Sequence, residues 1–577
     1  MRRSIRSGGT AAILATDGGP RPPRGSRALR RYHPDWPSPA GCRFQDPGGP
    51  ELNTLRRIAA RAAGPGWLGG IHPLLFAAYP VLFLWSQNLG EVPPEDVVQP
   101  LVLVVGLAAL ATLGLAIVFG MRARSALIVT PAIFGVLMYG HVLKLFGTPS
   151  DLLVAFAWLL VWVGFLAAWR LSTRRVLRVD RTLTGIGALL VGVSLISIVP
   201  YEVEEAMAAP PPVLVGGRTL PSQTTAQKRD VYWLVYDRYG SDRAMRNLYG
   251  VENDLTPWLS DRGFDVLEDS HANYVATSLS LSTTMNLVHL EELTGLVGSS
   301  TSSYNGVYRR LQNSLVPRQF QALGYRYLHL GSWWNPTRFD EAANRNYNAD
   351  GVNDFTSVLF TTSAMPLAVK ALGLEEQPPS EHTKHIKHNS YALDQLDRLR
   401  GEPGPKFVMA HILLPHPPYV YDSDGRPMTE EEAKTLEDKD AGRRQLAWTN
   451  TRIRSFVEGM LALPEDQQPI IILQADEGPW SDAYFADKVN YDWNTATPED
   501  LETKFGILNA WYVPGGTDSL QLRDDQTAIN TFPTLFTKYF GLDGYEELSD
   551  MVRTSSGWNR PYKLLDITDK LPSLTGG

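Results

Sequence analysis

Five apolar segments follow one another between residues 71 and 200, and they set the first constraint on the fold. Each is close to the ~20 residues that a helix needs to cross a bilayer. A soluble protein can bury helices this apolar, but five in series joined by short loops favour a multi-pass membrane domain. The expected spans are Ile71 to Leu89, Leu101 to Gly120, Ala126 to Phe146, Leu152 to Trp169 and Thr182 to Pro200.

The charges in the connecting loops predict how this domain is oriented. Basic residues precede the first segment and fill the second and fourth loops, whereas the other two loops are acidic. Because Lys and Arg gather on the cytoplasmic side, we expect a cytoplasmic N-terminus and an extracytoplasmic C-terminal domain, in a bacterial-type plasma membrane. The basic residues are Arg56, Arg57, Arg61, Arg122, Arg124, Arg170, Arg174, Arg175, Arg178 and Arg181, and the acidic ones are Glu91, Glu95, Asp96 and Asp151.

Composition divides the rest of the chain. Residues 1–52 are rich in Arg, Gly and Pro and lack an apolar period, which predicts a disordered basic cytoplasmic tail. The membrane domain occupies residues 53–200, and a Pro-rich, polar linker is expected over residues 201–229. The single cysteine, Cys42, lies in the tail, so the sequence excludes an internal disulfide and a thiolate metal site elsewhere.

Residues 230–577 alternate short apolar runs with helical patterns, which is typical of βαβ units around a buried sheet. We therefore expect an α/β domain with a mainly parallel central sheet. Ligands of such sheets collect beyond the carboxyl ends of the strands. The expected strands are Val231 to Tyr236, Arg326 to Leu330, Phe407 to Ile412, Ile470 to Leu473 and Gly506 to Val513, and the expected helices include Val307 to Ala322, His385 to Leu399 and Arg443 to Leu461.

Three carboxylates follow two of the expected strands. Asp237 comes directly after the first strand, and Asp476 and Glu477 come shortly after the run Ile470 to Leu473. Carboxylates at neighbouring strand ends repel one another unless a cation lies between them. Each alone would be a turn or cap residue, but the set in this order predicts one divalent cation. Oxygen ligands favour Mn²⁺ or Mg²⁺, with Ca²⁺ a further option.

Thr277 supplies the hydroxyl expected at this cation. It lies where a loop feeds a helix, within the stretch Asn273 to Asn286, so exposed backbone N–H groups surround it with partial positive charge. Such a position suits a nucleophile that becomes an alkoxide, and it also suits an incoming phosphate. The alternative is that Thr277 only caps the helix.

These motifs resemble the alkaline phosphatase superfamily in its sulfatase-like branch, from Asp230 to about Leu571. With five preceding spans, the chain is similar to lipoteichoic acid synthases and phosphoethanolamine transferases. The resemblance implies that Thr277 is the nucleophile. It implies that the metal ligands are Asp237, Thr277, Asp476 and Glu477.

Two further segments carry the resemblance to substrate-binding motifs of these enzymes. His416 is followed by two prolines and Tyr419, as is a phosphate-contacting His in the family. Trp334 and Asn335 match the start of a Trp-Asn-Arg segment, in which Pro336 replaces the Arg. The resemblance therefore implies substrate contacts from His416, Trp334 and Arg338, the last as a stand-in for the missing arginine.

The chain departs from the family pattern at three places. Glu477 stands where the family has a metal-binding His, and Lys504-Phe505-Gly506-Ile507 lacks the His of two-metal members. The signature of formylglycine-dependent sulfatases is absent around Thr277. These departures leave either a one-metal site or a domain that has lost catalysis. His411 is expected in the core or behind the ligands.

The expected function is a membrane-anchored, metal-dependent transfer of a phospho-alcohol group from a phospholipid to a cell-envelope acceptor, through a phosphothreonine. The acceptor would be a glycan or a lipid-linked alcohol. Two alternatives stay open: a sulfatase-like hydrolase of phosphodiesters or sulfate esters, and an inactive domain that binds envelope glycan or a partner. Nucleic acid is not expected as a partner, since the chain has a net charge of −7 and no basic stripe.

Overall fold

A computed structural model describes residues 69–571, apart from 147–149, 209–219, 293–302, 350–352, 374–378, 556 and 558–559. The chain divides into the units Met1–Arg57 and Ile58–Gly577, and every described residue belongs to the second. The predicted N-terminal tail and Cys42 lie outside the described residues.

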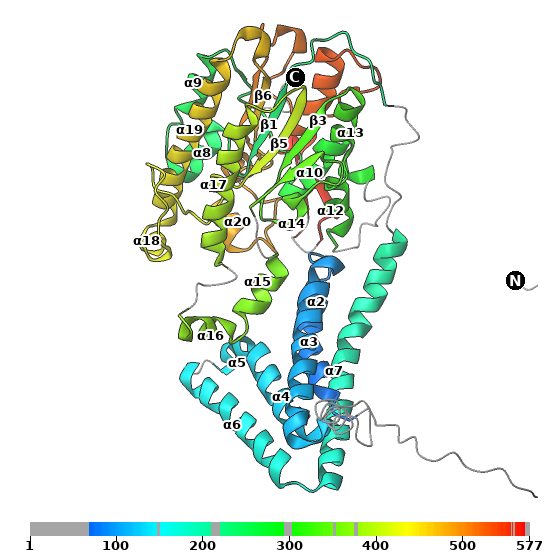
Figure 1. The fold of residues 1–577 in the computed structure, drawn as a ribbon. Helices are drawn as coiled ribbons and strands as arrows, with labels where there is room; N and C mark the ends of the chain where they lie inside the picture. The colour runs from blue at the N-terminus through cyan, green and yellow to red at the C-terminus, as the bar shows by residue number, and fades with distance from the viewer. Residues whose placement is uncertain are drawn as a thin grey trace, which may run out of the picture. The chain divides into compact units, whose positions relative to one another are not determined.

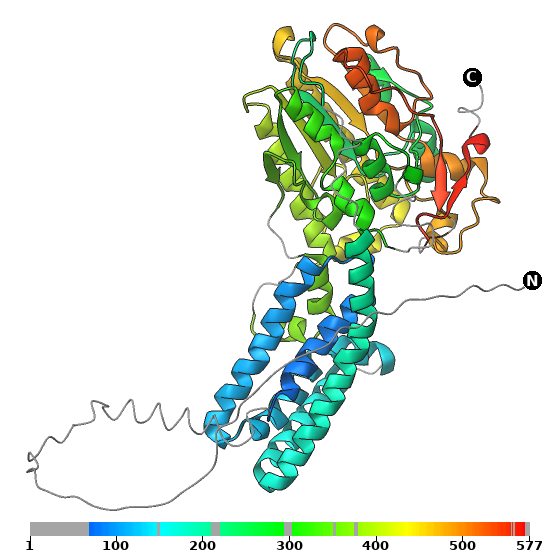
Figure 2. The ribbon, with the colours of Figure 1, turned by 90° about the vertical axis from the view of Figure 1, so that its right-hand side faces the viewer.

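Apolar helices make up the first described part of the chain (Figures 1 and 2). Two of them, Pro94–Phe119 and Thr173–Val203, are long and apolar enough to cross a membrane by length and composition. Their side chains include the exposed Leu110, Val118 and Ile196, which would contact water unless lipid or protein covers them. The helices are α2 (His72–Ser86), α3 (Pro94–Phe119), α4 (Arg122–Leu137), α5 (Tyr139–Phe146), α6 (Ser150–Arg170) and α7 (Thr173–Ala208).

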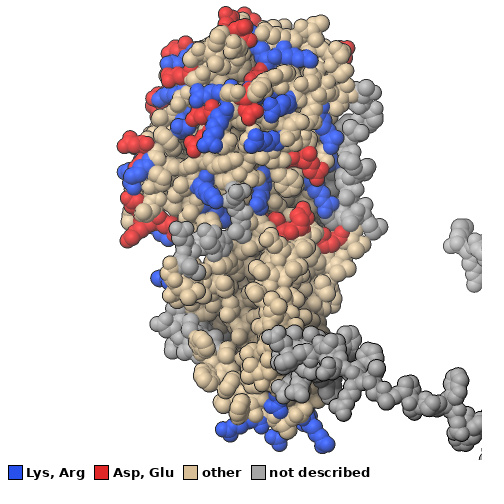
Figure 3. Space-filling model, in the orientation of Figure 1, with Lys and Arg blue, Asp and Glu red and all other residues tan. Residues whose placement is uncertain are grey.

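Charge is distributed along these helices as in a membrane protein. Figure 3 shows few charged side chains along the helical region and a group of Lys and Arg at its lower end. Basic residues flank the turns between α3 and α4 and between α6 and α7, which lie at that end in Figure 1. Apolar helices with basic loops at one end fit a membrane-embedded domain.

The third predicted span is broken into two helices. α4 ends at Leu137 and α5 begins at Tyr139, where a single helix from Ala126 to Phe146 was expected. The Gly140 N–H donates to the Thr362 carbonyl (2.8 Å), and the Ala364 N–H donates to the Val136 carbonyl (2.8 Å). These backbone hydrogen bonds to residues far along the chain take the place of bonds that a continuous helix would make.

The fifth predicted span is longer than expected. α7 continues through Pro200 to Ala208, so the first residues of the predicted linker are helical. The linker prediction at residues 209–219 falls outside the described residues.

A seven-stranded sheet organises the second part of the chain, in the order β2-β7-β6-β1-β5-β3-β4. All neighbouring strands from β6 to β4 pair in parallel, whereas β7 runs antiparallel to both β6 and β2. The mainly parallel α/β fold is therefore confirmed. The strands are β1 (Val231–Tyr236), β2 (Asp265–Val266), β3 (Arg326–Leu330), β4 (Arg345–Tyr347), β5 (Lys406–Ile412), β6 (Ile470–Gln474) and β7 (Asn509–Tyr512), with a separate pair β8 (Arg553–Ser555) and β9 (Leu564–Asp566).

Helices cover both faces of the sheet, as Figure 1 shows. Alternate side chains of β1 point to opposite faces, so Leu234 packs in one apolar cluster and Trp233 in the other. One cluster includes residues of α8 (Asp242–Tyr249), α9 (Leu255–Ser260), α17 (Glu381–Leu399) and α19 (Asp438–Leu461). The other includes residues of α10 (Thr277–Asn286), α12 (Asn305–Leu311), α13 (Leu315–Ala322) and α22 (Thr531–Thr534).

The predicted helix Val307 to Ala322 is two helices, α12 and α13. Pro317 explains the break, because a proline lacks an N–H and fits only in the first turn of a helix. The chain therefore restarts at Leu315, two residues before the proline. The remaining described helices are α14 (Asn335–Arg338), α15 (Asp354–Thr361), α16 (Met365–Ala371), α18 (Glu430–Thr435), α20 (Asp482–Ala486) and α21 (Pro498–Phe505).

Candidate functional site

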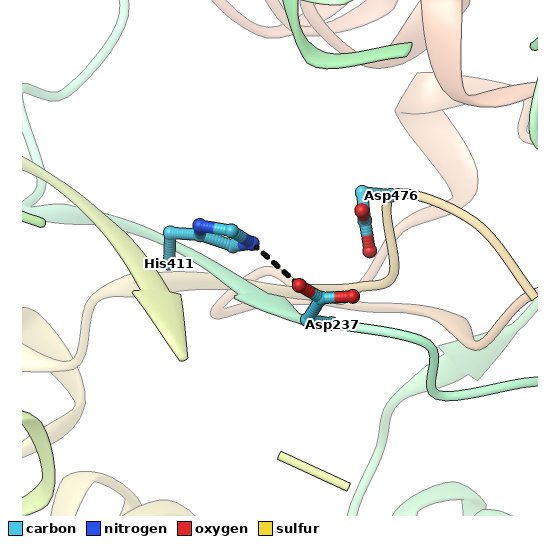
Figure 4. Close-up of side chains that lie close together, drawn as sticks. All are labelled: Asp237, His411 and Asp476. Atoms are coloured by element: carbon cyan, nitrogen blue, oxygen red, sulfur yellow. Dashed lines mark ion pairs between the residues drawn. The ribbon is translucent and has the colours of Figure 1, made fainter. Parts of the chain in front are cut away.

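Three neighbouring parallel strands bring Asp237, His411 and Asp476 together (Figure 4). Asp237 follows β1, His411 is the next-to-last residue of β5, and Asp476 follows β6 by two residues. One ligand atom from each side chain lies within 4.8 Å of the others, and all three residues are buried. His411 Nε2 is 3.3 Å from Asp237 Oδ2. The site therefore lies at the carboxyl end of the sheet, as predicted.

The unpaired atoms of this group fit a divalent cation. Among the described residues, Asp237 Oδ1, His411 Nε2 and Asp476 Oδ2 are buried and have no hydrogen-bond partner. Leaving a buried polar atom unpaired costs about 1–3 kcal/mol, and more for a charged group. One cation bound to these three atoms would remove that cost. The group contains a nitrogen atom, whereas the sequence predicted a set of oxygen ligands only.

The second ring nitrogen of His411 is held by Thr337. His411 Nδ1 lies 2.8 Å from Thr337 Oγ1, and this hydroxyl is 2.8 Å from Ser332 Oγ. When Nδ1–H donates to Thr337, Nε2 presents its lone pair, which is the form that a metal-binding imidazole needs. Thr337 thus orients His411 toward the two carboxylates.

The two aspartates have opposite pKa shifts. Burial and the neighbouring charges of Asp237 and Glu477 raise the pKa of Asp476 to about 7, against the opposing effects of His411 and a side-chain hydrogen bond with Thr277. Burial also disfavours ionisation of Asp237, but the nearby His416, His411 and Arg238 hold its pKa well below the usual range. Two carboxylates this close do not ionise independently, and a cation between them would favour both charged forms.

Thr277 is the first residue of α10, and Ala276 is the N-cap. No side chain caps this helix. Thr277 is therefore not an N-cap, which was the alternative role predicted for it. The Thr277 side chain instead lies close enough to Asp476 to lower the pKa of that carboxyl group. The hydroxyl therefore lies beside the three-residue group and at the N-terminal end of a helix, where backbone N–H groups favour negative charge.

Glu477 is engaged by two basic side chains. Its Oε1 accepts from Arg238 Nε (2.9 Å) and from Trp480 Nε1 (3.2 Å), and its Oε2 is 2.8 Å from Lys504 Nζ. Glu477 and Lys504 are fully buried, so each charge depends on the other for compensation. The structure groups Asp237 and Asp476 with His411 and places Glu477 in this separate ion-pair network.

A cavity of about 230 Å³ adjoins the group at Asp237. Its lining includes Thr277, Asp237, His416 and Trp334, which the sequence predicted as site residues. Arg338 does not line the cavity. Its charge instead acts on Asp96, Asp354 and His388, away from the cavity lining. The other lining residues are Glu91, Arg238, Ala276, Ser278, Tyr304, Tyr308, Trp333, Leu413, Glu477 and Trp480.

His416 is a neutral side chain at pH 7. Burial and the charge on Arg238 lower its pKa to about 4, although Asp237 works in the opposite direction. Its Nδ1 contacts the Pro417 carbonyl, which only accepts hydrogen bonds, so Nδ1 carries the proton. The lone pair of the neutral ring is then on Nε2.

Four residues near the site were not predicted to act there: Glu91, Arg238, His411 and Lys504. Arg238 follows Asp237 and has a φ of 58°, which is rare for a residue with a side chain and often marks a functional position. His411 lay inside an apolar run, and only its pairing with Val235 of β1 reveals its place beside Asp237. Glu91 reaches the cavity from the loop between α2 and α3, which a local motif does not reveal.

No protein-family model matches the chain, and no curated protein matches it. Solved structures similar to it include the C-terminal periplasmic domain of EptC from Escherichia coli in complex with Zn. That match has 13% identity, covers 60% of this chain and 96% of the other, and has a TM-score of 0.37.

Two further similar structures come from other bacteria. The integral membrane protein lipooligosaccharide phosphoethanolamine transferase A from Neisseria meningitidis has 13% identity, 80% and 95% coverage and a TM-score of 0.38. A protein in the alkaline phosphatase superfamily from Vibrio parahaemolyticus has 12% identity, 61% and 80% coverage and a TM-score of 0.34. These are the kinds of protein that the sequence motifs resemble. Likeness at this identity and TM-score has no bearing on the chemistry of the site.

Proposed function

We propose that the chain is a membrane-anchored, metal-dependent transferase that moves a phospho-alcohol group from a phospholipid to a cell-envelope acceptor through a phosphothreonine at Thr277. The proposal includes five membrane spans, a cytoplasmic N-terminus and an extracytoplasmic sheet domain. The observation that carries it is the position of Thr277, beside the group Asp237, His411 and Asp476 and in the lining of one cavity.

A contact between the two parts of the chain supports a lipid donor. Glu91 lines the cavity that contains Thr277, and it belongs to the loop between α2 and α3. The Tyr304 N–H donates to the Gly90 carbonyl (3.1 Å), and Asn305 Nδ2 donates to the Leu89 carbonyl (3.2 Å). A loop that joins two apolar helices lies at the bilayer surface, so this cavity would open where lipid headgroups are.

Asp237, Asp476 and His411 would hold one divalent cation, with Thr277 next to it. When bound, the cation would favour ionisation of the Thr277 hydroxyl and balance charge on the phosphate. An imidazole with two carboxylates suits Mn²⁺ and also Zn²⁺, whereas Mg²⁺ and Ca²⁺ prefer oxygen ligands alone. Glu477 would instead keep Arg238 and Lys504 in place.

In the first half-reaction, Thr277 Oγ1 attacks the phosphorus of a phospholipid. A bond forms between phosphorus and the Thr277 oxygen, and the bond between phosphorus and the diacylglycerol oxygen breaks. The Thr277 hydroxyl loses one proton, and the diacylglycerol oxygen gains one proton. Arg238, whose guanidinium lies 3.8 Å from the Trp480 ring centre, would orient the non-bridging phosphate oxygens.

In the second half-reaction, an acceptor alcohol attacks the phosphothreonine. The bond between phosphorus and Thr277 breaks as the bond to the acceptor oxygen forms, and the acceptor proton returns to the Thr277 oxygen. His416 lines the cavity with a free Nε2 lone pair and would receive that proton in passing. Trp334 would pack against the transferred group.

The proposal is tested with the full chain in vesicles that contain phospholipid with radiolabelled phosphate. We expect label on a peptide that contains Thr277, together with release of diacylglycerol. Thr277→Ala should lose both, and Thr277→Ser should keep both at a reduced rate. Thr361→Ala, which removes a threonine hydroxyl on α15, serves as the matched control.

Three results would contradict transfer. Diacylglycerol release at full rate from Thr277→Ala would exclude the covalent intermediate. Label that leaves Thr277 only as free phospho-alcohol, whatever acceptor is added, would indicate a hydrolase. Neither label nor bound cation would indicate a non-catalytic domain.

A further inference from the structure

A second and larger cleft lies on the other side of Arg238 and Trp480. It has a volume of about 470 Å³ and shares these two residues with the cavity that contains Thr277. Its other walls come from α8, α17, the segment after β5, α18, α19 and α20. We call it the outer cleft, and its lining residues used below are Tyr249, Tyr419, Asp438, Asp482 and Phe485.

The wall between the two cavities is built on one buried carboxylate. Arg238 Nε donates to Glu477 Oε1 (2.9 Å), and Trp480 Nε1 donates to the same oxygen (3.2 Å). The guanidinium stacks over the Trp480 ring at 3.8 Å. A molecule in the outer cleft therefore contacts the same arginine that faces Thr277, so the two cavities are adjacent parts of one site.

The lining of the outer cleft combines aromatic rings with carboxylates. Phe485 is 66% exposed at its edge, and the Tyr249 and Tyr419 hydroxyls lie 3.0 Å apart in its wall. Asp438 and Asp482 are exposed, and Asp482 pairs with Lys439 (3.0 Å). The aromatic rings can pack against C–H groups of a ligand, and the carboxylates next to them can accept hydrogen bonds from its hydroxyl groups. This lining suits a ligand that has apolar faces and hydroxyl groups along its edges.

Charge narrows the ligand class further. The lining contains four carboxylates, Glu381, Glu430, Asp438 and Asp482, and three basic residues, Arg238, Lys434 and Lys439. Lys434 and Lys439 are paired with carboxylates of the same lining, at 3.4 Å and 3.0 Å. No excess of positive charge remains to attract a polyanion. The lining thus suits a neutral molecule.

We propose that the outer cleft binds the acceptor, a neutral polyhydroxylated sugar, and delivers one of its hydroxyls to the phosphothreonine at Thr277. This inference rests on the proposed function. The sugar oxygen forms a bond to phosphorus, the bond between phosphorus and Thr277 breaks, and the sugar proton goes to the Thr277 oxygen.

The test compares the two half-reactions in the full chain, reconstituted in vesicles. The first rate is diacylglycerol release, and the second is loss of label from Thr277 after an acceptor is added. Two acceptor preparations are used in separate arms: delipidated envelope polysaccharide, and vesicles that contain a dihexosyl-diacylglycerol. These arms distinguish a glycan polymer from a glycolipid as the source of the sugar.

Asp438→Asn and Phe485→Ala, both exposed positions, are expected to lower the ratio of the second rate to the first at least tenfold and to raise the acceptor KM. Glu431→Gln and Val489→Ala, exposed positions that do not line the cleft, should keep the wild-type ratio. A thermal melt of each variant checks that it is folded.

Each other outcome is decisive. An unchanged ratio in both cleft variants overturns the assignment of the outer cleft, and so does the lack of acceleration by both acceptor preparations. Wild-type protein that never acquires label at Thr277 overturns the proposed function instead, because the first half-reaction does not involve the acceptor.

Discussion

Lys504 Nζ lies 2.8 Å from Glu477 Oε2, with both side chains fully buried next to the candidate metal ligands. Burial lowers the pKa of Lys504, and the Glu477 charge opposes that change. Because Glu477 is paired with Lys504, the candidate metal ligands are Asp237, His411 and Asp476, without Glu477. The positive charge of Lys504 would therefore repel a second metal ion bound close to it.

Lys504→Met should lower the free energy of unfolding by about 3–5 kcal/mol, because it leaves the buried Glu477 with only one charged partner. Adding Glu477→Gln to this variant should recover part of the loss. Chemical denaturation of the purified full chain measures both. Lys434→Met, which removes an exposed ion pair, is the matched control and should change little. A Lys504→Met protein as stable as wild type would show that the pair is unimportant.

The full chain should bind one divalent cation. Asp237→Asn, Asp476→Asn and His411→Ala should each abolish that binding at micromolar cation, since each removes a ligand. Glu477→Gln should keep it. Elemental analysis after gel filtration gives the stoichiometry. Loss of the ion in Glu477→Gln would favour the ligand set predicted from the sequence over the group in the structure, and two ions per chain would contradict both.

Thr337→Val should weaken cation binding by roughly 10–100-fold, because His411 loses the partner that fixes its ring. The side chain is similar in size, so the fold should be kept. A titration followed by calorimetry measures the change. Thr451→Val, which removes a hydroxyl that donates to its own helix at the Ala447 carbonyl, is the control. Equal affinities in wild type and Thr337→Val would argue against a positioning role.

Acid should remove the stabilisation that Glu502 provides. Burial raises its pKa, but His271 at 3.4 Å, a hydrogen bond from Ser241 and the charge of Arg243 outweigh this and lower it to about 2. A depressed carboxyl pKa contributes stability above the ordinary value of 4.5, and this is lost as the pH falls toward 2. The contribution is about 3 kcal/mol.

Glu502→Gln tests this directly. The variant should be less stable than wild type at pH 6, and the difference should shrink steadily as the pH falls below 4.5. Urea denaturation at several pH values measures it. A difference that is constant with pH would show that the ionised carboxylate is not the source of the stability.

Gly140→Ala should disturb the break between α4 and α5. A Cβ at this position would lie 2.6 Å from the Thr362 carbonyl oxygen, which is too close for any real contact. We expect a lower melting temperature and faster hydrogen exchange of the amide bonds near Thr362. Gly106→Ala is the control, because nothing lies within 4 Å of its added Cβ. Equal exchange rates in both variants would show that the close approach is unimportant.

The sequence predicted the central strands well, for a physical reason. β1 and most of β5 and β6 are continuous apolar runs because helices bury both of their faces, and β3 is buried beyond its first residue. β4 is the short segment Arg345–Tyr347, with two exposed residues, and so leaves no such run. The antiparallel direction of β7 depends on long connections and not on local pattern.

The candidate site was predicted in part. Asp237 and Asp476 follow apolar strands, and Thr277 begins a helix, so local rules placed them. The role of His411 depends on which strand lies beside β5, and the engagement of Glu477 depends on Lys504, which comes from α21. Both are tertiary relationships between distant segments. The helix break at Met138 has the same origin, since Thr362 and Ala364 hold it.

The Tyr304 N–H and the Asn305 side chain donate hydrogen bonds to the backbone carbonyls of Gly90 and Leu89, in the loop between α2 and α3. A secretable fragment cut after α7 would leave these donors to water and would be missing Glu91 altogether. Without Glu91 the lining of that cavity would be less acidic, so ligand binding measured on such a fragment would not represent that of the intact chain.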